Sequence, residues 1–336
     1  MRDIGTDDPR VRVRPGKGSR PRTKIRPDYS DARRGRVFRV DRGRYHVTMV
    51  DDGTNVVAVK ARELPRGSIV VGDLVAVVGD LSGRVDTLAR IVQVDERTST
   101  LRRTAEESEA VGVERVLVAN ADLLLIVSAA AQPEPRPGMI DRCLVAAYDA
   151  EMTPVLLITK TDLASPDPLL QLYEPLQLEI ISTTVPPDAS AAELADSLSK
   201  LRQRLAGHVA VLVGHSGVGK STLLNALVPQ AERETGAVNE VTGRGRHTST
   251  SAMAFSTDDA VIIDTPGIRT FGLAHVSADD LLDAFPDLAE IAQDCPRGCT
   301  HLTDEPECAL DTAVEPHLVR RVESFRRLLA TKNDPY

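Results

Sequence analysis

Residues 214–222 limit the possible folds of this 336-residue chain more than any other stretch. They read Gly-His-Ser-Gly-Val-Gly-Lys-Ser-Thr, after the apolar run 209–213 and before the helical segment 223–227. This matches the pattern G-x-x-x-x-G-K-[ST] between a strand and a helix. Its glycines let successive backbone N–H groups point inward, and the N-terminus of the helix adds the positive end of a dipole. The stretch therefore predicts a phosphate-binding loop for a nucleoside triphosphate.

Individual residues of this loop have separate expected roles. We expect the Lys220 ammonium to contact the β- and γ-phosphates and the Ser221 hydroxyl to bind Mg²⁺. The rest of the loop should surround the phosphates with backbone N–H groups. The expected nucleotide contacts here are Gly214, His215, Ser216, Gly217, Val218, Gly219, Lys220, Ser221 and Thr222.

A second apolar run, 261–263, ends in Asp264-Thr-Pro-Gly267. Asp264 is expected to hold Mg²⁺ through water, and the N–H of Gly267 to sense the γ-phosphate. Taken alone, Asp-Thr-Pro-Gly would be an ordinary turn. Its place after a strand, downstream of the phosphate loop, favours a role at the nucleotide.

Residues 159–162, Thr-Lys-Thr-Asp, follow the apolar run 155–158 and favour guanine over adenine. A carboxylate at position 162 can accept hydrogen bonds from N1–H and from the N2 amine of guanine, and adenine offers no such pair. Each lost charge-assisted bond costs about 1.5–3 kcal/mol. The lysine stem can cover the base while its ammonium approaches the phosphate loop. The expected base contacts are Thr159, Lys160, Thr161, Asp162 and, through its backbone, Ser182 in the polar run 182–184.

The base-reading element precedes the phosphate loop, whereas ordinary GTPases place it last. Because strand ends converge at one edge of a sheet, the same site can form from a chain that is cut elsewhere. Apolar strand-like runs alternate with helical segments here, which predicts a mostly parallel sheet with helices on both faces. The expected strands are 123–127, 155–158, 179–182, 209–213 and 261–263, and the expected helices are 139–150, 191–205 and 221–227.

Upstream of this region, five short apolar runs with a period of two are separated by turn signals. They predict a small antiparallel barrel, and the oligonucleotide-binding (OB) fold is the commonest five-stranded choice. A barrel without a ligand of its own is the alternative. Aromatic residues make up only 3% of the chain, so backbone-directed binding is favoured over base stacking. The five runs are 37–40, 45–50, 56–59, 74–78 and 91–94.

Residues 10–36 carry eleven Lys or Arg and two Asp, in a chain whose net charge is −8. Pro and Gly in this segment argue against a helix. It is interpreted either as a solvated, disordered tail or as an arm that contacts the phosphates of a nucleic acid. The sequence leaves both open.

Three of the four cysteines gather with one histidine as Cys295-x3-Cys299-x-His301-x6-Cys308. The N-terminus lacks a signal-like apolar segment and no run is long enough to span a membrane, so we expect a cytoplasmic protein with reduced thiols. Three thiolates and an imidazole then predict one closed, structural Zn²⁺ site. Cys143 is interpreted as a core residue. The basic amphipathic stretch 319–329 is expected either to touch RNA or to pack.

Together these elements resemble the circularly permuted GTPases of small-ribosomal-subunit maturation, the RsgA or YjeQ family. The barrel, residues 159–162, the phosphate loop, 243–248, 264–267, Phe-Gly-Leu at 271–273 and the Cys/His cluster follow the family's order over about 35–330. The resemblance implies an OB-fold domain, a permuted GTPase domain and a zinc-binding domain. It also implies GTP hydrolysis that the small ribosomal subunit stimulates, with that subunit and its rRNA as partners.

Three features depart from the family pattern. Thr159 stands where an Asn is common, which predicts a weaker tether between the base-reading element and the phosphate loop. The zinc ligands are spaced by three and six residues, where four and five are usual. The basic arm is longer than the family pattern requires, so its role is not inherited.

The polar, Gly-rich stretch 241–251 suits a loop that Mg²⁺ and the γ-phosphate order. Thr248 is our candidate for its Mg²⁺ ligand, with Ser249 and Thr250 as alternatives. Ile268 follows Gly267 at a place where many GTPases carry a Gln that orients water, and Ile cannot do so. His247 is the candidate replacement, in line with the resemblance, because an imidazole can bind the attacking water. A surface or RNA-facing histidine is the alternative.

We therefore expect a multidomain monomer that uses Mg²⁺ with GTP and binds no membrane. An RNA-binding protein that uses GTP only as a latch is a second hypothesis. A P-loop kinase is a third, against which the carboxylate at 162 argues. The expected divisions are a basic arm at 1–35, a five-stranded OB-type β-barrel at 36–98, a linker at 99–115, a circularly permuted α/β P-loop GTPase domain at 116–273 and an α-helical zinc-binding domain at 274–336.

Overall fold

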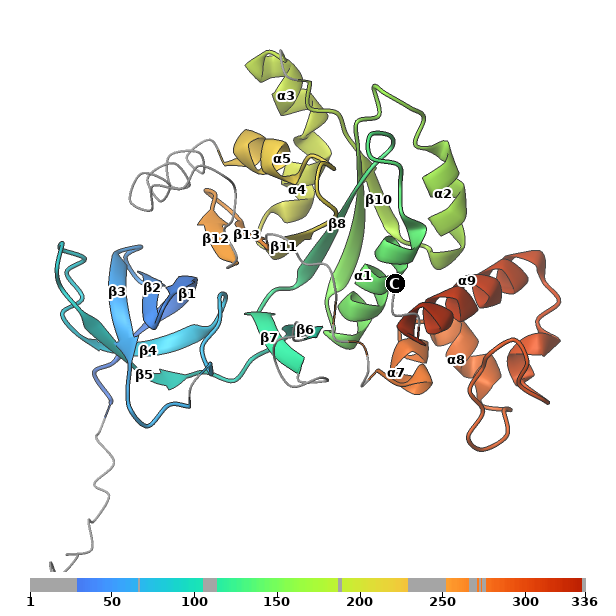
Figure 1. Ribbon diagram of the computed structural model, residues 1–336, viewed down its shortest axis with the longest axis horizontal. Coiled ribbons are helices and arrows are strands. Elements are labelled where there is room, and N and C mark those ends of the chain that lie inside the picture. Colours follow the sequence, from blue (N-terminus) through green and yellow to red (C-terminus); the bar gives the residue numbers. More distant parts are fainter. Residues whose placement is uncertain are drawn as a thin grey trace, which may run out of the picture. The chain divides into compact units, whose positions relative to one another are not determined.

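The computed structural model describes residues 29–65, 67–104, 114–186, 189–228, 252–265, 271, 273 and 276–333 (Figure 1). The chain divides into residues 1–31 and a compact unit that begins at Ala32. Among the described residues, none of the helices has the length and apolar character needed to cross a bilayer.

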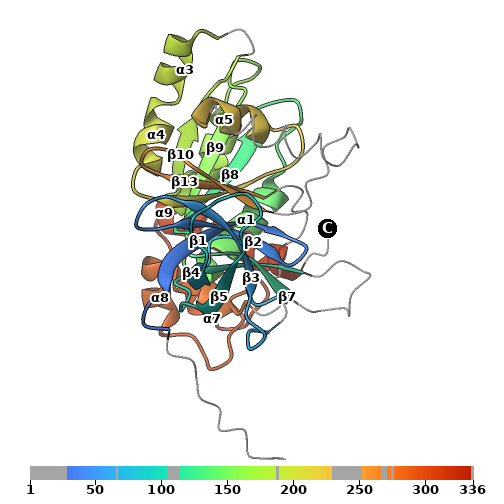
Figure 2. The same ribbon diagram turned by 90° about the vertical axis from the view of Figure 1, so that its left-hand side faces the viewer.

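The first five strands form a closed barrel, in the order β1-β2-β3-β5-β4 with β4 pairing back to β1 (Figures 1 and 2). All neighbours are antiparallel except β3 and β5. Alternate residues such as Val37, Val47 and Ile91 are buried inside the barrel, as a period of two requires. The predicted five-stranded barrel is confirmed. Its strands are β1 Arg33–Asp41, β2 Arg44–Met49, β3 Asn55–Lys60, β4 Leu74–Gly79 and β5 Ala89–Val94.

A two-stranded hairpin follows the barrel. Strand β6 spans Thr100–Thr104 and pairs antiparallel with β7, Glu114–Ala119. The stretch interpreted as a linker thus contains paired backbone, which its mixed Thr and Arg composition did not reveal.

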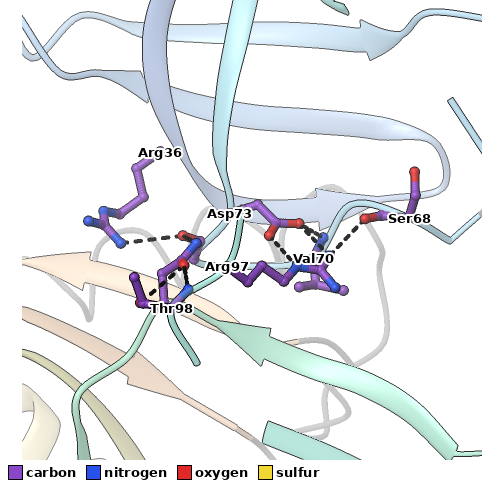
Figure 3. Close-up of polar contacts among 8 residues, drawn as sticks. Arg36, Ser68, Val70, Asp73, Arg97 and Thr98 are labelled. Carbon is purple, nitrogen blue, oxygen red and sulfur yellow. Dashed lines mark hydrogen bonds and ion pairs between the residues drawn. The ribbon is translucent and has the colours of Figure 1, made fainter. Parts of the chain in front are cut away.

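A buried aspartate binds the segment that leads from the barrel to this hairpin (Figure 3). The Asp73 side chain is fully buried and accepts hydrogen bonds from Arg97 at 2.7 and 2.9 Å and from the Val70 N–H at 2.8 Å. Arg97 also donates to the Ser68 carbonyl at 2.8 Å. One carboxylate therefore joins the loop before β4 to the segment that leaves β5.

Backbone groups reinforce the same contact. The Ala119 N–H of β7 donates to the Val71 carbonyl at 3.0 Å, and the Gly72 carbonyl accepts from the Asn120 amide at 3.2 Å and from Arg36 at 3.3 Å. Gly72 has φ +92°, and a Cβ there would lie 1.9 Å from the Ala119 carbonyl oxygen. Only glycine allows the two backbones to approach this closely.

The central sheet has the order β10-β9-β8-β11-β13-β12, and all neighbours are parallel except β12 with β13. All five predicted strands are present. Strand β12 was not predicted. It also pairs with β1 of the barrel, at Arg39 opposite Met253, so one sheet runs through both parts. The strands are β8 Leu123–Ala129, β9 Thr153–Thr159, β10 Glu179–Ser182, β11 Val209–Val213, β12 Met253–Ser256 and β13 Val261–Asp264.

Helices cover both faces of this sheet (Figure 1). In β8, Leu124 and Ile126 belong to the apolar cluster that contains α1, whereas Leu123 and Leu125 belong to the cluster that contains α4 and α5. Burial on both faces explains the uninterrupted apolar run of this strand. The helices are α1 Pro137–Asp149, α2 Asp167–Tyr173, α3 Ala191–Ser197, α4 Ser199–Leu205 and α5 Lys220–Leu227.

The C-terminal part is helical, as predicted: α7 Ala278–Leu282, α8 Pro286–Ala292 and α9 Pro316–Asn333, with a 3₁₀ turn at Ala309–Thr312. Helix α9 packs through Phe325, whose ring meets Phe285 edge-on at 5.5 Å. Its arginines bind within the chain: Arg321 pairs with Asp287 at 2.5 Å and Arg327 with Asp141 at 2.9 Å. Of the two interpretations of this basic helix, the structure therefore favours packing.

Candidate nucleotide and metal sites

The phosphate loop joins β11 to α5, as its pattern predicted. Gly214 lies so close to β8 that a Cβ would come within 2.4 Å of the Val127 carbonyl oxygen, and Gly219, at the start of α5, has φ +100°. The Lys220 ammonium folds back over the loop and donates to the carbonyls of Gly214 at 2.5 Å and His215 at 2.9 Å. The backbone thus has the curvature that a phosphate cradle needs.

Hydroxyl groups suited to nucleotide binding lie in the first turn of α5. Ser221 and Thr222 are both exposed there. His215 is half-buried, and its Nδ1 lies 2.9 Å from the Ser216 carbonyl oxygen. Two of the expected nucleotide contacts, Ser221 and Thr222, therefore lie in the first turn of α5.

Asp264 ends β13, the strand next to β11. Its Oδ1 is buried without a hydrogen-bond partner among the described residues. Burial raises the pKa of Asp264 above its usual value, and the nearby Lys220 charge only partly opposes this shift. Burial lowers the pKa of Lys220. A buried carboxylate oxygen without a partner, beside a phosphate loop, is suited to accept a hydrogen bond from a water molecule bound to Mg²⁺.

Residues 159–162, the expected base-reading element, lie against the phosphate loop, although they come earlier in the chain. The Thr159 hydroxyl at the end of β9 donates to the Val218 carbonyl at 2.6 Å. The Lys160 ammonium donates to the Gly217 carbonyl at 2.7 Å and also to the Gln132 carbonyl. A tether between the two elements is thus present with threonine at position 159.

The Asp162 side chain is exposed at this edge and is held by one neighbour. The Thr184 hydroxyl donates to its Oδ1 at 2.6 Å and accepts from the Asp162 N–H at 3.3 Å; Thr161 lies 3.4 Å from the same hydroxyl. Sequence reasoning noted 182–184 only for a backbone contact through Ser182, which lies exposed at the end of β10. The signal for Thr184 was a hydroxyl just after the strand that pairs with β9.

Several predicted site residues lie outside the described residues. These are the proposed catalytic residue His247, the candidate Mg²⁺ ligands Thr248, Ser249 and Thr250, and Gly267 with the neighbouring Ile268.

The four predicted metal ligands come together. The ligand atoms of Cys295, Cys299, His301 and Cys308 lie within 4.8 Å of one another. The His301 Nδ1 is 3.6, 3.4 and 3.8 Å from the three sulfurs in that order. A tetrahedral ion with Zn–S and Zn–N bonds of usual length gives an N–S edge of about 3.6 Å. Spacings of three and six residues therefore still place these groups where one metal ion could bind.

A mostly parallel sheet whose phosphate loop is hydrogen-bonded to Thr159 and Lys160, from earlier in the chain, defines a circularly permuted P-loop nucleotide-binding protein. A family model described as RsgA GTPase matches residues 94–274. The chain belongs to the RsgA GTPase family.

Curated relatives include "Small ribosomal subunit biogenesis GTPase RsgA" of Pseudomonas putida (strain F1), which is 40% identical over 225 residues, 64% of this chain and 63% of that protein. The protein of the same name from Pseudomonas aeruginosa (strain LESB58) is 40% identical over 230 residues, 66% of this chain and 65% of that protein. The chain thus matches slightly less than two thirds of the length of these relatives.

Two solved structures are similar in fold. YjeQ from Thermotoga maritima has a TM-score of 0.61 and 26% identity, covering 88% of this chain and 98% of that chain. YloQ, described as a circularly permuted GTPase, has a TM-score of 0.61 and 22% identity, covering 92% of this chain and 98% of that chain. The likeness to YloQ concerns the fold alone.

Proposed function

We propose that this protein hydrolyses GTP to GDP and phosphate, binds the small ribosomal subunit with its rRNA, and assists late maturation of that subunit. One observation carries the nucleotide part: the bonds from Thr159 and Lys160 to the phosphate loop hold Asp162 and Lys220 in one site. The names of the curated relatives support the ribosomal part.

In this proposal each element has its own role. Asp162 reads the guanine edge and Thr184 fixes the orientation of its carboxylate, while the Lys160 stem covers the base. Lys220 and the loop 214–222 bind the phosphates. Mg²⁺ supplies charge neutralisation at the phosphates when bound, and Ser221, Thr248 and Asp264 would hold it. The Gly267 N–H senses the γ-phosphate, the Ser182 backbone contacts O6, and His247 orients the attacking water.

Base preference tests the nucleotide part of the proposal. Titration of the full chain with GTP, ATP and xanthosine triphosphate should show strong preference for GTP. Asp162→Asn should instead prefer xanthosine triphosphate. In xanthine a C2 carbonyl replaces the N2 amine of guanine, and the Asn carboxamide can donate a hydrogen bond to it. Asp167→Asn, exposed at the start of α2, is the matched control and should keep the guanine preference. Equal affinity for ATP and GTP would refute the assignment.

Turnover tests the enzymatic part. GTP hydrolysis should be slow in the free protein and faster with small ribosomal subunits, and His247→Ala should abolish the stimulation. Binding to subunits without turnover would instead support a GTP-controlled latch. Unchanged stimulation in His247→Ala would remove that residue from the mechanism.

We further propose Zn²⁺ as the ion of the Cys295, Cys299, His301 and Cys308 cluster, one per chain and structural, since the four ligands leave no open position. Verified removal of the ion should unfold the C-terminal part first, because binding energy in small zinc sites is local folding energy. We also propose a monomer inside the cell, with divisions at residues 98 and 273; the expected divisions at 35 and 115 fall inside β1 and β7.

A further inference from the structure

One arginine of the last helix contacts the metal-ligand cluster directly. The Arg326 Nε donates to the His301 carbonyl at 3.0 Å, and another guanidinium nitrogen lies 3.7 Å from the Cys308 sulfur, within reach of an N–H···S hydrogen bond. The third nitrogen pairs with Asp311 at 2.8 Å. The Arg326 side chain is only 14% exposed, whereas its partner Asp311 is 50% exposed.

The three contacts of Arg326 differ in what they bind. The ion pair with Asp311 joins α9 to the 3₁₀ turn after Cys308, and it adds to the contacts of Phe325, Arg321 and Arg327 that dock the helix. The other two contacts reach the backbone of one ligand residue and the sulfur of another. A docking role alone gives no reason for them.

Charge gives a reason. Three thiolates and a neutral imidazole around a divalent ion carry a formal charge of −1, and a buried charge is costly unless it is paired. The guanidinium keeps its proton at any ordinary pH and offers several donors in a fixed plane. The Ala309 N–H, 3.2 Å from the Cys295 sulfur, supports a second thiolate in the same manner.

We infer that Arg326 is a positioning residue of the metal site. It fixes His301 and Cys308 relative to each other and offsets the negative charge of the metal–thiolate cluster. This inference rests on the proposed metal site and adds a residue that lies 18 positions beyond the last ligand. Groups that orient ligands from outside the first coordination sphere typically change metal affinity about 10–100-fold.

The test measures Zn²⁺ affinity of the full chain by competition with a chromophoric chelator, and the thiolate-to-metal absorption of the Co²⁺-loaded protein. Arg326→Met should weaken Zn²⁺ binding about 10–100-fold and shift the Co²⁺ spectrum. Arg326→Lys should recover part of the affinity, because it keeps the charge but not the planar donors. Arg320→Met is the matched control on the exposed side of the same helix and should bind as the wild type does.

Asp311→Asn separates positioning from docking. It weakens the ion pair that docks the helix but leaves the contacts to His301 and Cys308. If Arg326 supports the metal site, Asp311→Asn should keep most of the Zn²⁺ affinity. This comparison remains informative if Arg326→Met is too unstable to purify. Equal Zn²⁺ affinity in the wild type and Arg326→Met, or a loss in Asp311→Asn as large as in Arg326→Lys, would overturn the inference. A wild type that binds no stoichiometric Zn²⁺ would instead refute the metal site itself.

Discussion

Two contacts each contain a buried aspartate bound to an arginine. One joins the barrel to the segment that leads into the hairpin β6–β7, and the other joins α1 to α9. In the first, Asp73 and Arg97 are accompanied by backbone hydrogen bonds and by Gly72, which has no room for a side chain. In the second, Asp141 accepts from Arg327 and from the Tyr173 hydroxyl at 2.9 Å.

The described hydrogen bonds from α9 to α1 and to residues 174–175 all come from arginine side chains. Backbone contacts fix a register that no single side chain controls, whereas side-chain contacts can be removed one at a time. One substitution should therefore disrupt the whole barrel contact, whereas each substitution in the α9 contact should remove only part of its stability.

Gly72→Ala should have the largest effect. Its Cβ would lie 1.9 Å from the Ala119 carbonyl oxygen, at φ +92°, so the barrel loop must move away from β7. We expect a loss of about 4 kcal/mol in the free energy of unfolding, at the top of the usual range for one substitution. Denaturant unfolding measures it. Gly67→Ala is the control: it also has a positive φ, but its Cβ meets no described heavy atom within 4 Å. Similar losses in both variants would contradict the close approach.

Asp73→Asn should follow. The change removes the carboxylate charge that pairs with Arg97 at a fully buried position. Breaking a buried ion pair lowers the free energy of unfolding by about 3–5 kcal/mol. The lower end applies here, since Arg97 keeps 22% of its side chain exposed. Denaturant unfolding of Asp73→Asn, Arg97→Met and the double variant gives the coupling between the two residues. A coupling near zero would show that the backbone bonds alone hold this contact.

Arg327→Met should cost less, about 2 kcal/mol near neutral pH, because Arg327 is 30% exposed. Burial raises the pKa of Asp141 and the Arg327 charge lowers it, so the pKa should rise further in the variant. A raised carboxyl pKa means that the folded state holds its proton to higher pH than the unfolded state. The stability deficit of Arg327→Met should therefore be small in acid and grow as the pH rises through and above the usual carboxyl range. A deficit that is independent of pH would contradict this.

Arg320→Met should have the smallest effect. Arg320 pairs with Glu174 at 3.1 Å, but 56% and 64% of the two side chains are exposed. Exposed pairs contribute about 0–1 kcal/mol and weaken with salt. Thermal unfolding at low and high salt should show almost no difference from the wild type. A loss as large as that of Arg327→Met would mean that exposed pairs also hold the helix.

Features that the sequence predicted correctly are contiguous. The phosphate loop, the element 159–162 and the barrel strands each fit in a short window whose residues and period define a local structure. The cysteine cluster was also visible, because four potential ligands within 14 residues indicate a shared metal ion.

Features that the sequence did not reveal depend on residues far apart in the chain. The Thr184 hydroxyl reaches Asp162 from 22 residues away, and Arg327 reaches Asp141 from 186 away. Their identities are ordinary for exposed loops and helices, so only the packing of strands and helices assigns them partners. Strand β12 is a similar case, because it is defined by its neighbours β13 and β1.

The pairing of β12 with β1 has a consequence for truncated forms of the chain. A sheet that ends in an open strand presents unpaired N–H and C=O groups, which can recruit a strand from another molecule. Here the barrel lies on that border, at Arg39 opposite Met253. We therefore expect a fragment that starts after the barrel to present β12 to other copies of itself and to self-associate more readily than the full chain.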